Sequence, residues 1–227
     1  MTLLEIANFV CAKHGKSDDT TKSFLRDATR RMYEFVWQYA PWQDTLTYST
    51  YTVTAGNRTV TLGSTVEVPL AVAYGDAEVQ AVDLNWIFRT EPDLLDTDRY
   101  GTPLYYVRRP RSSAGVAAID IYPYIEAGQA VETLKVLEKL KVKSLNTSGN
   151  LATDSDSPAI SGIDNVLISL VEGEFLQRER QYQKATAVKN EAVAELSNMA
   201  SLELNQGGAT RRIVPASLGE YSVADWA

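Results

Sequence analysis

The sequence predicts an α+β fold, in which a helical bundle carries an inserted antiparallel β-domain and an extended C-terminal arm. Apolar residues recur every three to four positions near both ends of the 227-residue chain and every second position in its middle. A polar stretch then separates the alternating part from the last helical part. We expect the bundle at 1–42 and 158–206, the β-domain at 43–142, a flexible loop at 143–157 and the arm at 207–227.

Two amphipathic helices are predicted at the start of the chain. The first covers residues 2–13 and ends at His14-Gly15. The second covers about residues 20–39, follows N-cap candidates at 18–20 and stops before Pro41. Their apolar positions are Leu3, Leu4, Ile6, Ala7, Val10 and Cys11, then Phe24, Leu25, Ala28, Met32, Phe35, Val36 and Tyr39.

After Trp42 the apolar period changes to two, which is typical of strands. A strand rich in Thr and Tyr is predicted at 45–54, and the turn Ala55-Gly56-Asn57 predicts that residues 59–62 pair back on it as a hairpin. Residues 91–98 are predicted to form one helical turn. Further strands are predicted at 70–74, 79–86, 104–108, 118–122 and 133–142.

One long helix is predicted from Ile163 to Leu204. Some 40 residues at about 1.5 Å each span roughly 60 Å, more than a domain of this size covers. The distal half must therefore project, fold back at a kink or pack on another chain, and Gly173 is the candidate weak point. The proximal apolar face is wide, with Ile163, Val166, Leu167, Leu170, Val171, Phe175 and Leu176; the distal stripe is narrow, with Tyr182, Ala185, Val188, Ala192, Leu196 and Met199.

The arm that follows Gly207-Gly208 is apolar, but it is short and begins with glycine. These properties predict a segment that does not fold alone and becomes ordered on docking to a partner, with the two glycines as its hinge. Its candidate docking residues are Arg211, Arg212, Ile213, Val214, Pro215, Leu218, Tyr221 and Trp226.

Composition excludes several classes of protein. With 44% hydrophobic and 22% charged residues the chain can bury a real core. The net charge of −7 argues against a surface dominated by nucleic-acid binding, which needs a field of Lys and Arg. No apolar run approaches the roughly 20 residues that span a bilayer, so we expect a soluble cytoplasmic product without a membrane partner.

Residues for catalysis or metal binding are scarce. His14 is the only histidine and Cys11 the only cysteine, and Cys11 falls on an apolar helix face, which predicts a buried structural thiol. The stretch 96–101 resembles the start of a calcium loop but lacks its later ligands, and so does 154–156. We therefore expect no enzyme, no metal and no cofactor.

One basic cluster stands out against the acidic background. Arg108, Arg109 and Arg111 lie beside Tyr105 and Tyr106. The cluster could contact a nucleic-acid backbone or an acidic partner. It could equally be a strand end whose arginines are solvated or paired with nearby carboxylates, and the acidic surroundings favour this second interpretation.

The order of elements resembles that of the head-to-tail adaptor (connector) proteins of tailed bacteriophages, from Leu3 to about Ala200. The segments that carry the resemblance are the helix end with Trp37 and Trp42, the strand at 45–54, Val68-Pro69-Leu70, the stretches 101–107 and 119–123, and Ser157-Pro158 opening the long helix with 165–174.

The resemblance implies a virion neck protein, assembled in the host cytoplasm. About twelve copies would form a ring under the capsid portal, extend the channel through which DNA leaves without sequence-specific binding, and dock the next neck or tail protein. The C-terminal segment of such adaptors often reaches into the portal ring, a role that falls here on Arg211–Pro215 and the residues through Trp226. Alternatives are another neck, tail-completion or fibre-attachment ring protein, or a non-viral cytoplasmic oligomeric binding module.

Overall fold

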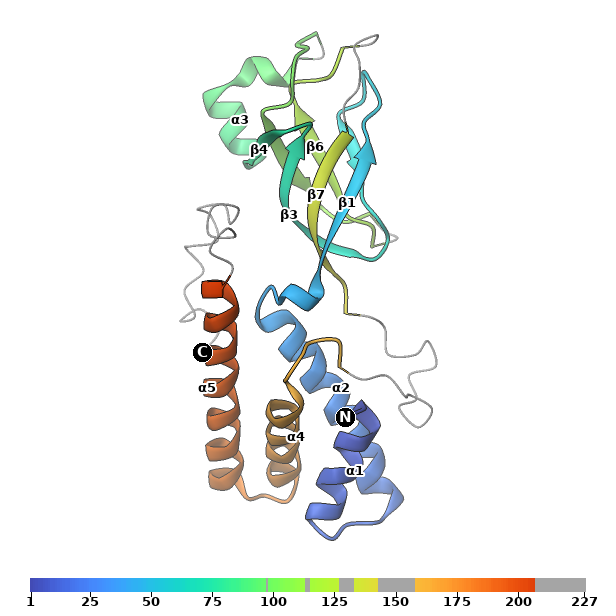
Figure 1. The fold of residues 1–227 in the computed structure, drawn as a ribbon, viewed down its shortest axis with the longest axis vertical. Coiled ribbons are helices and arrows are strands. Elements are labelled where there is room, and N and C mark those ends of the chain that lie inside the picture. Colours follow the sequence, from blue (N-terminus) through green and yellow to red (C-terminus); the bar gives the residue numbers. More distant parts are fainter. Residues whose placement is uncertain (97, 113–114, 127–132, 143–157, 207–227) are drawn as a thin grey trace. The chain divides into compact units, whose positions relative to one another are not determined.

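The computed structural model shows a mixed α+β fold, with five α-helices and a curled seven-stranded sheet in the part of the chain that it describes (Figure 1). The described residues are 1–96, 98–112, 115–126, 133–142 and 158–206. They divide into two compact units, a helical unit formed by residues 1–45, 142 and 158–206, and a sheet unit formed by the described residues of 46–141.

The helical unit is built around α4 (Asp164–Arg178), which packs against α1 (Leu3–Lys13), α2 (Asp19–Tyr39) and α5 (Tyr182–Gln206). The helices α1 and α2 also pack on each other. They lie on one side of α4, and α5 lies on the other (Figure 1). None of the described helices is long and apolar enough to cross a membrane.

Both predicted N-terminal helices are confirmed, and their first turns explain where they begin. The Thr2 side chain accepts a hydrogen bond from the Glu5 N–H, and the Glu5 side chain accepts one from the Thr2 N–H, which makes a capping box. The Asp18 carboxylate caps α2 by accepting from the Thr21 N–H at 2.8 Å, and these bonds lower the pKa of Asp18.

The prediction of one continuous C-terminal helix is wrong. The chain turns at residues 179–181, and α5 folds back along α4 (Figure 1). Arg180 has a φ of +60°, in the left-handed region, and the Gln181 N–H returns to the Leu176 carbonyl, which closes α4. Of the three expected outcomes for the distal half, folding back at a kink is the one observed.

Gly173 is not the break; it lies inside α4, where the side chain of Lys189 on α5 packs closely on it. A Cβ atom at this position would lie 2.5 Å from Cγ of Lys189 on α5. The proximal apolar face is buried as predicted, whereas Tyr182, assigned to the distal stripe, is 60% exposed.

The sheet has the strand order β1-β7-β3-β4-β5-β6-β2. Neighbours are antiparallel except β4 and β5, which are parallel, so the predicted antiparallel domain is in fact mixed. The strands are β1 (Leu46–Thr52), β2 (Thr59–Thr61), β3 (Val66–Tyr74), β4 (Ala77–Ala81), β5 (Tyr105–Arg109), β6 (Ala118–Tyr122) and β7 (Thr133–Leu140).

Two local predictions in this unit are wrong. The hairpin between the first two strands does not form, because β1 pairs with β7 and β2 pairs with β6. The strand predicted at 79–86 ends at Ala81, and α3 (Leu84–Thr90) follows, because the Asp83 carboxylate caps it by accepting from the Trp86 N–H. The helical turn expected within 91–98 is present as a 3-10 turn, η2 (Pro92–Leu95).

One carboxylate lies inside the sheet unit. Glu138 on β7 is 1% exposed and accepts hydrogen bonds from the hydroxyls of Ser49 and Tyr51 on β1. The Tyr51 hydroxyl in turn accepts from the Gly63 N–H at 2.9 Å. This polar network satisfies the buried acid and ties the loop after β2 to β1.

Candidate interaction surfaces

The predicted docking arm lies outside the described residues. This applies to Arg211, Arg212, Ile213, Val214, Pro215, Leu218, Tyr221 and Trp226, to the glycine hinge, to the loop at 143–157 and to the carboxylates at 154–156. The surfaces that the structure does describe are the basic strand β5, the helix α3 and the charged faces of the helical unit.

The three arginines of the basic cluster do not form a single patch. Arg108 and Arg109 are consecutive residues of β5, so their side chains leave opposite faces of the sheet. Arg108 lies on the face of Tyr106, whereas Arg109 lies on the face of Asp120 and Thr59. A flat array of guanidinium groups, as a phosphate backbone would require, is therefore not present here.

Two of these arginines bind neighbouring strands. Arg109 Nε lies 3.3 Å from Asp120 Oδ2, and its Nη1 donates to the Thr59 hydroxyl at 3.1 Å. Arg111 Nη2 donates to the Glu67 carbonyl oxygen at 2.8 Å. These contacts favour the second sequence-based interpretation, in which the arginines of a strand end pair within the domain.

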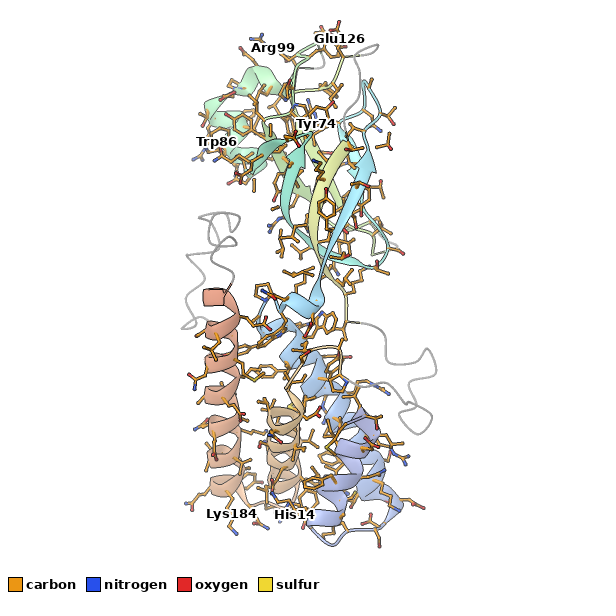
Figure 2. All side chains as sticks on the ribbon, in the orientation of Figure 1. His14, Tyr74, Trp86, Arg99, Glu126 and Lys184 are labelled. Atoms are coloured by element: carbon orange, nitrogen blue, oxygen red, sulfur yellow. The ribbon has the colours of Figure 1, made fainter. Side chains whose placement is uncertain are left out.

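The two tyrosines of β5 also make their contacts within the sheet unit. Tyr106 is 1% exposed and points its hydroxyl at the Leu70 carbonyl, and burial raises its pKa. The Tyr105 hydroxyl donates to Glu91 Oε1 at 3.0 Å, a bond that raises the pKa of Tyr105. Trp86, labelled in Figure 2, belongs to α3. Its ring lies 5.0 Å from that of Tyr105, which holds α3 against β5.

Arg58, which was not among the predicted site residues, joins two other segments of the sheet unit. Its guanidinium group lies over the rings of Tyr122 and Tyr124, at 4.1 and 4.2 Å from their centroids. It also donates to the carbonyls of Leu94 and Leu95 at 3.1 and 3.3 Å. No sequence pattern indicates this role, because the partners come from two segments that are both distant from Arg58 in the sequence.

The outward face of α3 is apolar. Leu84 and Phe88 are four residues apart, so they share a helix face, and they are 53% and 67% exposed. Ile87, on the neighbouring side of the helix, is buried with Val107 and Tyr122. The exposed pair was not predicted, because a strand was expected up to Trp86. The helical spacing of residues 84 and 88 is the sequence signal that indicates it.

In the helical unit, the only histidine of the chain takes part in contacts between two helices. His14, labelled in Figure 2, follows the last residue of α1. Its Nε2 lies 3.1 Å from Oε1 of Glu172 on α4, and its imidazole ring lies 4.5 Å from the ring of Phe175. Lys13 Nζ donates to Oε2 of the same carboxylate at 2.6 Å. These contacts fasten the end of α1 to α4.

The thiol and the carboxylates considered for chemistry are dispersed. Cys11 is buried as predicted, at 4% exposed, and burial raises its pKa. In the loop that resembles a calcium site, Arg99 pairs with Asp93 at 3.4 Å. Within the described ranges, no three residues among His, Cys, Asp and Glu are grouped to hold a metal ion.

Comparison with known proteins does not assign the chain to a family. No protein-family model matches the sequence, and a search of curated proteins finds no match. Function must therefore be argued from the chain's own elements and surfaces.

Proposed function

We propose that the protein is a structural adaptor of a bacteriophage virion neck. In this proposal copies of the chain form a ring under the capsid portal, extend the DNA channel and present a docking surface to the next neck or tail protein. The supporting observation is the architecture. The helical unit is assembled from the two ends of the described chain, and the sheet unit comes from the residues between them, as in a helical bundle with an inserted β-domain.

The distribution of polar groups supports a structural rather than a catalytic role. The histidine, the buried Glu172 and the basic residue Arg109 are each engaged in contacts between elements. The exposed features are instead apolar or charged side chains on helix surfaces, such as Phe88 on α3. Such surfaces suit contact with other proteins.

The C-terminal arm is the proposed attachment to the portal. Ile213, Val214, Tyr221 and Trp226 would be its apolar anchors, and Arg211 with its neighbour would add charge. A net charge of −7 per copy would keep the channel from holding the passing DNA, because like charges repel. A channel lined mostly by Lys and Arg would contradict this last point.

The test is reconstitution with a candidate portal protein from the same virus. Imaging the mixture should show a ring of copies stacked on the portal. A chain that lacks residues 209–227 should fold, with an unchanged circular dichroism spectrum, but should not dock. A matched control replaces the arm with a Gly/Ser segment of equal length, which should also fail to dock.

Three outcomes would redirect the proposal. Normal docking of the truncated chain would show that the arm is not the anchor. A ring that binds another neck or tail protein but not the portal would favour a tail-completion or fibre-attachment role. A stable small oligomer without any virion partner would favour the cytoplasmic binding module.

A further inference from the structure

The helical unit carries free negative charge on the outer face of α5. Glu191 and Glu195 are one helical turn apart and exposed. In the described part of the chain neither carboxylate has a hydrogen bond or an ion pair. Leu202 lies eleven residues after Glu191, close to the same stripe, and is 60% exposed. Ala185, Ala192 and Leu196 lie roughly 100° around the helix from this stripe and are buried, and α5 packs on α4.

A basic stripe lies across α4, on α2. Lys22, Arg26 and Arg30 follow each other at intervals of four, so they share one side of the helix. Lys22 has a weak partner, Asp19, at 3.9 Å. Arg26 makes no ion pair within the described ranges, and its Nε is buried without a hydrogen bond there. The neighbouring helix α1 exposes the large apolar side chain Phe9, which is 48% accessible.

α2 meets α5 only near its C-terminal end, where the hydroxyls of Tyr39 and Ser197 are hydrogen bonded. The basic stripe begins at the other end of α2, and the described part of the chain shows no ion pair between the two stripes. A head-to-tail contact between identical copies joins two different, complementary surfaces, and opposite charge is one form of complementarity. Such a contact closes into a ring when the rotation from copy to copy permits closure. The spacing also matches, since charges four residues apart recur on both helices at about 6 Å.

We propose that α5 of one copy docks on the α1–α2 side of the next copy, with Glu191 and Glu195 facing Lys22 and Arg26. This inference rests on the proposed ring and identifies the contact that builds it. Leu202 and Phe9 supply apolar area at the same two surfaces. Each of the two stripes is thus the binding surface for another copy of this chain.

The size of the contact makes it weak in isolation. A helix of 25 residues is about 37 Å long. A strip about 10 Å wide along it presents roughly 400 Å² per copy, about half of what a typical stable complex buries on each partner. Each copy in a closed ring makes two such contacts, so assembly is favoured by closure and weakened by salt.

A charge-swap experiment on the full chain tests the contact. The variant E191K/E195K reverses the α5 stripe, and K22E/R26E reverses the α2 stripe. At low salt and on the order of 100 µM, the wild type should associate in sedimentation velocity, and each variant alone should associate at least about tenfold more weakly. An equal mixture of the two variants should recover association, because every contact then joins opposite charges. The chain that carries all four substitutions should recover it as well.

Sedimentation velocity also serves for the control variant and for the outcomes that would contradict the proposal. Glu78 is exposed on β4 in the sheet unit, and E78K should associate as the wild type does. If K22E/R26E loses its helical circular dichroism, K22E alone replaces it in the mixture. A wild type that stays monomeric, variants that associate normally, or a mixture that does not recover each overturn the proposal.

The result is separable from the portal experiment. Association that follows the charge-swap pattern without portal binding would retain this contact and remove the adaptor role. A ring that forms on the portal despite both charge reversals would retain the adaptor role and remove this contact.

Discussion

The contacts of Arg58 lead to a test at the level of a single residue. The guanidinium group stacks on two tyrosine rings and donates to two carbonyls of η2. Lysine keeps the charge but has neither the planar stack nor the forked donors. We expect Arg58→Lys to lower the free energy of unfolding by about 1–3 kcal/mol in urea titration.

Arg89 provides the matched control for this prediction. It is an exposed arginine on α3, and the described part of the chain gives it no ion pair. Arg89→Lys should change the unfolding free energy by less than about 0.5 kcal/mol. Equal losses from the two substitutions would show that the stacked geometry of Arg58 contributes nothing specific.

Residue-scale prediction from sequence failed where strand boundaries matter. The sequence predicted that this strand ends at Arg108, and Arg109 was grouped with Arg108 and Arg111 in one basic cluster. With the strand continuing to Arg109, alternation separates two neighbouring arginines onto opposite faces. A shift of one residue in the boundary thus changes a basic cluster into two unrelated contacts.

At the scale of elements, the packing of α4 on α5 depends on Gly173. Alanine is the better helix former by about 1 kcal/mol, but its Cβ would meet the stem of Lys189. Lys189 Nζ is held by Glu174 at 2.6 Å and by Gln177 at 2.8 Å, so moving this stem disturbs both bonds. We expect Gly173→Ala to destabilise the wild type but to stabilise the Lys189→Ala variant.

A double-mutant cycle measured by thermal unfolding checks this sign change. Ala187 is an exposed position on α5, and Ala187→Gly should cost about the helix-propensity difference in both backgrounds. Additivity of Gly173→Ala and Lys189→Ala would mean that the close approach of the helices carries no cost.

The turn between α4 and α5 gives a second prediction for these elements. Arg180 has a left-handed backbone, which costs a non-glycine residue roughly 1 kcal/mol, and glycine adopts it freely. Arg180→Gly should therefore leave the stability in urea unchanged or raise it by up to about 1 kcal/mol. Arg180→Val should lower it, and the reverse order would show that the turn is not strained.

The same turn shows why the helix boundary could not be predicted. Residues 178–181 contain neither Gly nor Pro, and their residue types all favour helix. The break is decided instead by the apolar faces of α4 and α5, which bury each other only if the chain reverses. Packing between elements overrode local propensity.

At the scale of the whole molecule, sequence predicted which segments are strands better than it predicted their partners. The alternation at 46–52 and 133–140 identifies two strands, but nothing local indicates that they pair with each other. The attractive turn at Ala55-Gly56-Asn57 favoured a hairpin that does not form. Pairing between distant segments depends on how the complete sheet closes its core, which alternation alone does not encode.

The sheet unit as a whole should be sensitive to alkaline pH. Burial raises the pKa of Tyr51, Tyr106 and Tyr122. Above about pH 10 the unfolded chain loses the phenolic protons that the folded unit keeps, so stability falls as pH rises.

Tyr106→Phe removes one such group. The unfolding free energy of this variant in urea should fall less between about pH 8 and pH 10.5 than that of the wild type. Tyr48→Phe changes a tyrosine that is 61% exposed and should leave the wild-type pH dependence in place. Identical pH dependence in all three chains would show that buried phenols do not control alkaline unfolding.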